Sequence, residues 1–148
     1  MSRRAEIAMT ATEVAAFIAD QRVVTCATVG RDGWPHLMPL WFVVRDGECW
    51  AWTYAKSQKV RNLERDPRCT LQFETGSEYH ELRGVMLKAE AVIHREGVLE
   101  LGVEIFERYT GGPVDPDALR GQATKRVGLQ FVVHAVASWD HRKLAGVY

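Results

Sequence analysis

Residues 52–73 read WTYAKSQKVRNLERDPRCTLQF, and this stretch decides the fold. An aromatic β-type run leads into a short helix, and a second β-type run follows it. Ser57 is a suitable N-cap, because its hydroxyl can accept a hydrogen bond from the free amides of the first helical turn. Pro67 cannot continue a helix. We therefore predict a short helix over residues 57–65 between two strands.

The opening of this helix carries cations where the helix dipole is itself positive. Lys56 lies just outside it and Lys59 just inside, and residues 56–68 hold five basic against two acidic side chains. The unpaired first-turn amides also attract anions. Val60 and Leu63 are expected to face the core. Two interpretations remain open, a solvated surface helix or a pocket for a phosphate or carboxylate.

The sequence on either side of this stretch is mostly β-type. A capping box at Thr10 predicts an amphipathic helix, and a second long helix is expected over 97–110. Turn residues at 31–33 and 45–47 separate neighbouring strands, which implies antiparallel pairing. Pro39 predicts an edge strand or a bulge. We expect a mainly β fold with flanking helices, a small barrel or strongly coiled sheet, with strands at 23–30, 34–47, 48–55, 68–75, 82–95 and 128–140.

Composition excludes several classes of protein. The 148 residues suit one domain, and the formal net charge of zero argues against a nucleic-acid binder built on bulk positive charge.

The three cysteines are far apart and set in apolar stretches, so buried free thiols are expected, and no metal-binding spacing occurs. No apolar run reaches the ~20 residues that a membrane span needs. The N-terminus lacks the apolar region of a secretory signal. We expect a cytoplasmic protein without a membrane or nucleic-acid partner.

Aromatic residues gather just before the predicted helix. Trp50, Trp52 and Tyr54 alternate along one strand and therefore share a face. They can pack in the core or form a wall for a flat ligand. The C-terminal SWDHRKLAGVY includes Trp139, which would be costly to leave in water. A flat ring together with a phosphate is what a flavin-like cofactor offers.

The quoted stretch resembles the pyridoxamine 5′-phosphate oxidase superfamily of FMN-binding split β-barrels. The family pattern has an aromatic–Thr pair, Ser-x-Lys at the helix start, an Asn and then a Pro. The segment ATVGRDGWPHLMPLWF also looks like the first hairpin of the family, and the similarity extends over about residues 10–95. The resemblance implies that Thr53, Ser57, Gln58 and Lys59 hold the cofactor phosphate and side chain. Lys56, from the charge at the helix start, and Asn62, from the matching pattern, complete the predicted site.

This chain departs from the flavin-using oxidases in its second strand. Those proteins carry an Arg and a Lys that help to hold the FMN phosphate, whereas HLMPLWFVV has neither. The C-terminal Arg-x-His type motif for the pyridoxamine-phosphate substrate is not reproduced by DHRKL either. The chain more closely resembles the actinobacterial branch that uses the deazaflavin cofactor F420, some members of which share an RNL-x-RDP helix.

The resemblance implies a homodimer with two cofactor sites at its interface. The C-terminal tail would then reach the site of the partner, with Trp139 and Arg142 as the contacts. We expect an oxidoreductase that passes a hydride from reduced F420 to a small organic acceptor, with no catalytic side chain assigned. An FMN-dependent reductase or oxidase of the same fold, and a cofactor carrier or sensor without turnover, are the alternatives.

Overall fold

The computed structural model describes residues 2–147 as one seven-stranded sheet in which every neighbouring pair of strands is antiparallel. The strand order is β2-β1-β5-β6-β7-β4-β3. The strands are β1 (Val24–Val29), β2 (Pro35–Leu40), β3 (Val43–Arg45), β4 (Glu48–Tyr54), β5 (Arg68–Thr75), β6 (Arg83–His94) and β7 (Arg126–Asp140).

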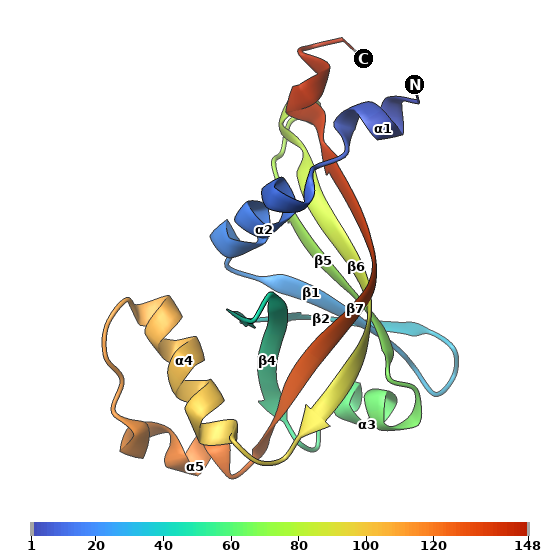
Figure 1. Ribbon diagram of the computed structural model, residues 1–148. Coiled ribbons are helices and arrows are strands. Elements are labelled where there is room, and N and C mark those ends of the chain that lie inside the picture. Colours follow the sequence, from blue (N-terminus) through green and yellow to red (C-terminus); the bar gives the residue numbers. More distant parts are fainter. Residues whose placement is uncertain (1, 148) are drawn as a thin grey trace.

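The sheet curls until its two edges come together (Figure 1). Edge strands β2 and β3 lie at opposite ends of the strand order, yet only Trp41 and Phe42 separate them in the chain. The single strand predicted over 34–47 is therefore wrong, because the chain crosses from one edge to the other here. Phe42 is fully buried, and its N–H and C=O bond to Tyr109 and Arg108 of α4. The prediction that Pro39 marks an edge strand is confirmed.

Helices close the curled sheet on both of its faces. The main core fills the concave inside of the sheet, where Phe17 of α2 and Val60 and Leu63 of α3 pack against inward-facing strand residues. A second core lies on the other face of β3 and β4, where α4 covers Trp52. The helices are α1 (Arg3–Ile7), α2 (Ala11–Asp20), α3 (Gln58–Arg65), α4 (Val98–Thr110) and α5 (Arg120–Ala123), with short 3₁₀ turns at Tyr79–Glu81, Pro116–Leu119 and His141–Leu144.

The mainly β prediction with flanking helices is confirmed, and α3 has the cap that the sequence indicates. Ser57 accepts a hydrogen bond from the Val60 amide, and Thr10 caps α2 in the same way through the Glu13 amide. The predicted helix over 97–110 is α4. Helix α1 was not predicted from the sequence, because five residues without a buried side chain leave no hydrophobic period.

Candidate functional site

The candidate site lies where β4 ends and α3 begins, at one end of the curled sheet (Figure 1). The strand carries Thr53 on its inner face, next to buried Ala51 and Trp52. After Tyr54 the chain turns, and the Ser57 amide donates to the Tyr54 carbonyl. This turn fixes the direction in which the first turn of α3 points.

Lys59 is buried, with 7% of its surface exposed, although the sequence placed it at the opening of the helix. Its Nζ donates to Oγ1 of Thr53 at 3.0 Å, so two of the residues in the family pattern are brought together. Burial lowers the pKa of the Lys59 ammonium, because desolvation disfavours the charged form. The nearby Cys26 thiol acts in the opposite direction. A buried ammonium with one bond to a hydroxyl retains donors for an anion.

Asn62 is fully buried and ties α3 to β1. Its Nδ2 donates to Oγ1 of Thr28 at 3.0 Å, and its Oδ1 accepts from Nε2 of Gln58 at 2.9 Å. Arg65 donates to the carbonyl of Val29 and to the Asn62 amide oxygen. Thr28 was missed from the sequence, although its alternation with Cys26 along β1 places both inside. The role of Asn62 seen here is to hold the helix against the sheet.

The start of α3 fits an anionic group. Within residues 2–147, the backbone N–H groups of Gln58 and Lys59 donate to no protein acceptor. The Ser57 hydroxyl accepts from Val60 and keeps its own hydrogen to donate. Lys56 is exposed directly beside them. Two free amides, a hydroxyl and an ammonium are the donor set that phosphate-binding helix starts use, so the phosphate of a flavin-type cofactor suits this position.

A hollow of about 480 Å³ opens between the β1–β2 hairpin and α3. The hairpin residues of this hollow were not predicted as site residues, because neither a turn nor a single histidine in a strand forms a recognisable motif. Trp34 stands at the hairpin with 75% of its surface exposed. We call this space the hairpin hollow; it is lined by Gly30, Arg31, Asp32, Trp34, Pro35, His36, Gln58 and Asn62.

The tryptophans of β4 pack against protein and do not form an open wall. Trp52 is buried against α4 and lies under the Arg126 guanidinium, 4.6 Å from the ring centroid. Trp50 is half-buried beside His94, with ring centroids 4.8 Å apart. Among the three aromatic residues that share this face of β4, only Tyr54 is exposed, and the Arg126 guanidinium lies over its ring as well. The structure favours the core interpretation for Trp50 and Trp52.

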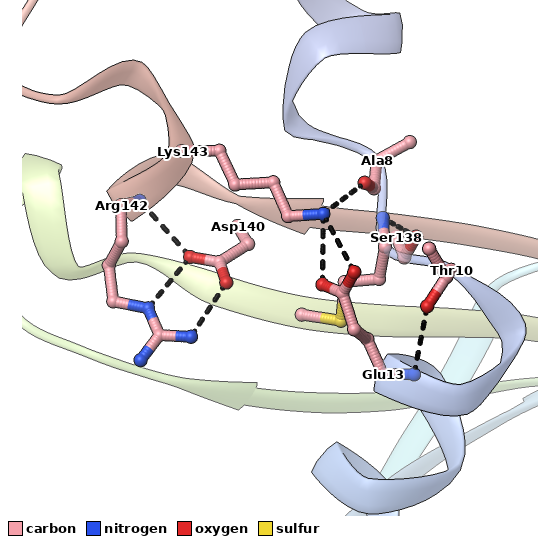
Figure 2. Close-up of polar contacts among 8 residues, drawn as sticks. Ala8, Thr10, Glu13, Ser138, Asp140, Arg142 and Lys143 are labelled. Atoms are coloured by element: carbon pink, nitrogen blue, oxygen red, sulfur yellow. Dashed lines mark hydrogen bonds and ion pairs between the residues drawn. The ribbon is translucent and has the colours of Figure 1, made fainter.

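The C-terminal tail is ordered by contacts within its own chain, at the end of the sheet opposite α3 (Figure 1). Arg142 forms two hydrogen bonds with the carboxylate of Asp140, at 2.9 and 2.7 Å. Lys143 bridges to the Ala8 carbonyl and to Glu13, which ties the tail to α2 (Figure 2). The structure therefore does not bring Trp139 and Arg142 near the α3 site of the same chain, and their contact with a partner's site stays a prediction.

The three cysteines are free and buried, as predicted. Cys26 and Cys69 lie on neighbouring strands β1 and β5. A hydrogen bond from Cys69 lowers the pKa of the Cys26 thiol, whereas burial raises the pKa of Cys49 to about 12. Among the described residues no group of three metal-ligating side chains occurs. None of the described helices is long and apolar enough to cross a membrane.

Solved structures resemble this chain over most of its length. Conserved hypothetical protein Rv2991 from Mycobacterium tuberculosis is 43% identical, with a TM-score of 0.91, over 100% of this chain and 95% of that chain. An F420 reductase is 19% identical, with a TM-score of 0.69, over 82% of this chain and 94% of its own. A FAD-binding protein from Mesorhizobium loti is 17% identical, with a TM-score of 0.68, over 88% and 94%. The last two share the fold.

Comparison with curated proteins gives no match. The family model described as pyridoxamine 5′-phosphate oxidase matches residues 10–140 of this chain. That range includes the curled sheet and the β4–α3 junction, and it ends at Asp140, before most of the C-terminal tail. The protein therefore belongs to the pyridoxamine 5′-phosphate oxidase family.

Proposed function

We propose that the protein is an oxidoreductase that binds the deazaflavin cofactor F420 and transfers a hydride between it and a small organic acceptor. The observation that carries this proposal is the donor set at the start of α3, where Ser57, two free amides and Lys56 surround an anion position. Thr53 and Lys59, which are hydrogen-bonded to each other, belong to the same junction of β4 and α3.

The residues of the chain would bind and orient the cofactor. Lys59 and Lys56 neutralise its phosphate, and the Ser57 hydroxyl and the Gln58 amide donate to it. Thr53 fixes the Lys59 ammonium and limits how it can move. Asn62 keeps α3 in place through Thr28. When bound, the cofactor ring supplies the hydride, and fixed orientation of the two reactants is the contribution of the protein.

The choice of F420 over FMN is supported by the chemistry of β2. The inward-facing residues of this edge strand are His36, Met38 and Leu40, which alternate opposite Thr28, Cys26 and Val24 of β1. None of the three is an arginine or a lysine. FMN in this family relies on such cations in the second strand, so the phosphate here depends on α3.

Two titrations test the proposal. Purified protein is titrated with F420 and, separately, with FMN, followed by cofactor fluorescence. We expect micromolar or tighter binding of F420 and weaker binding of FMN. The Lys59→Ala variant should lose at least about tenfold in affinity, whereas Arg4→Ala, which changes an exposed cation of α1, should bind as the unchanged protein does. Absence of binding to both cofactors would refute the assignment.

The absorbance of the purified protein and the oxidation of reduced cofactor distinguish the proposed enzyme from an FMN-dependent enzyme and from a carrier or sensor. An FMN-dependent enzyme would keep FMN through purification and show flavin absorbance. A carrier or sensor would bind reduced F420, yet added acceptors would not speed its oxidation. We expect acceptor-dependent oxidation of reduced F420, measured as the return of the absorbance of the oxidised cofactor.

We also propose that two copies of the chain associate through the outer face of β1, β2, β5 and β6. Strand register places Leu37, Ala27, Thr70 and Lys88 in one row across this face. Leu37 is 57% exposed. A hollow of about 640 Å³ lies here between Ala27, Thr70 and Lys88. None of the described helices covers these residues, whereas α4 covers the same side of β3 and β4. A second copy would bury the exposed apolar side chains.

A further inference from the structure

A hollow of about 470 Å³ lies between α1, the start of α2 and β7, at the end of the sheet opposite α3 (Figure 1). Its size falls within the range of roughly 300–1,000 Å³ that is usual for small-molecule sites. None of its lining residues belongs to the α3 site. We call this space the α1 hollow; its walls include Arg4, Met9, Val14, Val136 and Ser138.

Val136 faces the concave side of the sheet, yet 54% of its surface is exposed. Strand register places it opposite Leu87 of β6, and side chains of such cross-strand pairs share a face. Leu87 is 4% exposed and belongs to the main core, against which Met9 and Val14 also pack. The α1 hollow is therefore a place where the apolar interior of the sheet is left open to solvent.

Helix α1 borders this opening without filling it, since none of its residues is buried. Polar bonds hold the link between α1 and α2 against β7 and the tail. The Met9 amide donates to Oγ of Ser138 at 2.9 Å, and Nζ of Lys143 donates to the Ala8 carbonyl at 2.9 Å (Figure 2). The walls of the α1 hollow are thus held in place by hydrogen bonds, and its apolar surface remains available to a ligand.

The charge of the lining favours an anionic group on that ligand. Arg4 is the one charged residue among those that line the α1 hollow. Within residues 2–147, no carboxylate forms an ion pair with it. Glu13, in the first turn of α2, is bound to Lys143 at 2.9 Å. The Ser138 hydroxyl accepts from Met9 and keeps its own hydrogen to donate. A guanidinium and a hydroxyl are suitable donors for a carboxylate.

We propose that the α1 hollow binds a straight-chain carboxylate, a fatty acid. Its alkyl chain lies on Met9, Val14 and Val136, which removes their exposed apolar surface from water. Its carboxylate accepts hydrogen bonds from Arg4 and Ser138. An uncharged amphiphile of the same length lacks the partner for Arg4, and a cationic one is repelled by it. This site is separate from the proposed cofactor site and does not depend on it.

A series of ligands tests the site by isothermal titration calorimetry, below the concentrations at which the ligands form micelles. Decanoate should bind, and octanoate and hexanoate should each bind roughly tenfold more weakly than the next longer acid, because each lacks two further methylenes. Decanol and decyltrimethylammonium should bind more weakly than decanoate. Arg4→Gln should weaken decanoate about fivefold, whereas the matched control Arg3→Gln, at the neighbouring arginine outside the hollow, should change nothing.

A second pair of variants and a spectrum of the unchanged protein locate the ligand. Val136→Asp should abolish decanoate binding, whereas Val133→Asp, at another exposed valine of β7 that does not line the hollow, should leave it intact. In the unchanged protein, decanoate should move the backbone amide ¹H–¹⁵N signals of Met9 and Ser138. Unmoved signals would overturn the proposal, and so would decanol binding as tightly as decanoate. If decanoate fails to bind while Val136→Asp lowers the mass seen by light scattering, the hollow is a contact between copies and the proposal is wrong.

Discussion

At the scale of single residues, Lys59 is the side chain whose environment differs most from its expected one. It was expected at an open helix start, and it lies inside, bonded to Thr53. Its lowered pKa means that the folded state binds this proton less tightly than the unfolded chain does. The free energy of unfolding therefore rises with pH, from the lowered pKa of the folded protein up to the ordinary value of 10.5.

Replacing Lys59 by methionine tests this directly. Methionine keeps most of the volume and removes the buried charge, so at pH 7 Lys59→Met should be at least as stable as the unchanged protein. The difference in unfolding free energy should shrink as pH rises toward 10, measured by urea denaturation at each pH. Lys56→Met, at an exposed lysine, should show no such trend. A difference that grows with pH would contradict the buried charge.

Gly102 of α4 shows how tightly Trp52 is held. A Cβ at this position would lie 2.4 Å from the Trp52 ring. Gly102→Ala should therefore destabilise the protein by about 1–3 kcal/mol through overpacking, although alanine favours a helix. Gly121→Ala in α5, where a Cβ meets nothing within 4 Å, is the matched control and should be neutral or stabilising. Thermal unfolding of both variants measures the contrast, and equal melting temperatures would refute it.

At the scale of elements, α2 and α3 begin with the same kind of cap but only one cap faces the candidate site. Ser57→Ala and Thr10→Ala should each cost about 1 kcal/mol, because each removes the acceptor for a first-turn amide. Only Ser57→Ala should also weaken cofactor binding. Chemical denaturation and cofactor titration on the two variants check both effects. If Thr10→Ala weakened binding equally, loss of stability alone would explain the result.

Most elements could be predicted from the sequence, because turn residues and side-chain alternation are local signals. The helix α3 and its cap followed from residues close together in the chain, whereas the hydrogen bond between Lys59 and Thr53 was not predicted. The break at Trp41 and Phe42 could not be predicted, since it depends on Arg108 and Tyr109 more than sixty residues away. The hairpin hollow could not be predicted either, because its turn residues and its strand histidine form no motif.

At the scale of the whole molecule, the outer face of the sheet predicts association. Leu37→Asp places a charge on the exposed apolar side chain at the β2 end of the proposed contact, so it should shift a dimer toward monomer. The matched control Val44→Asp changes a valine of β3 with 47% of its surface exposed, outside that face. Light scattering after size-exclusion chromatography gives the mass of each species. A monomeric unchanged protein at micromolar concentration would refute the association.

The place of β7 in the sheet has a consequence for how the protein is made. This strand follows all the other described strands in the chain, and it lies between β6 and β4 in the sheet. A ribosome that has released residues 1–125 has made every other strand, yet β4 and β6 still lack their shared neighbour. Both then offer unpaired backbone groups to other chains. Synthesis of β7, Arg126–Asp140, is the step before which a stalled or truncated nascent chain would be most prone to aggregate.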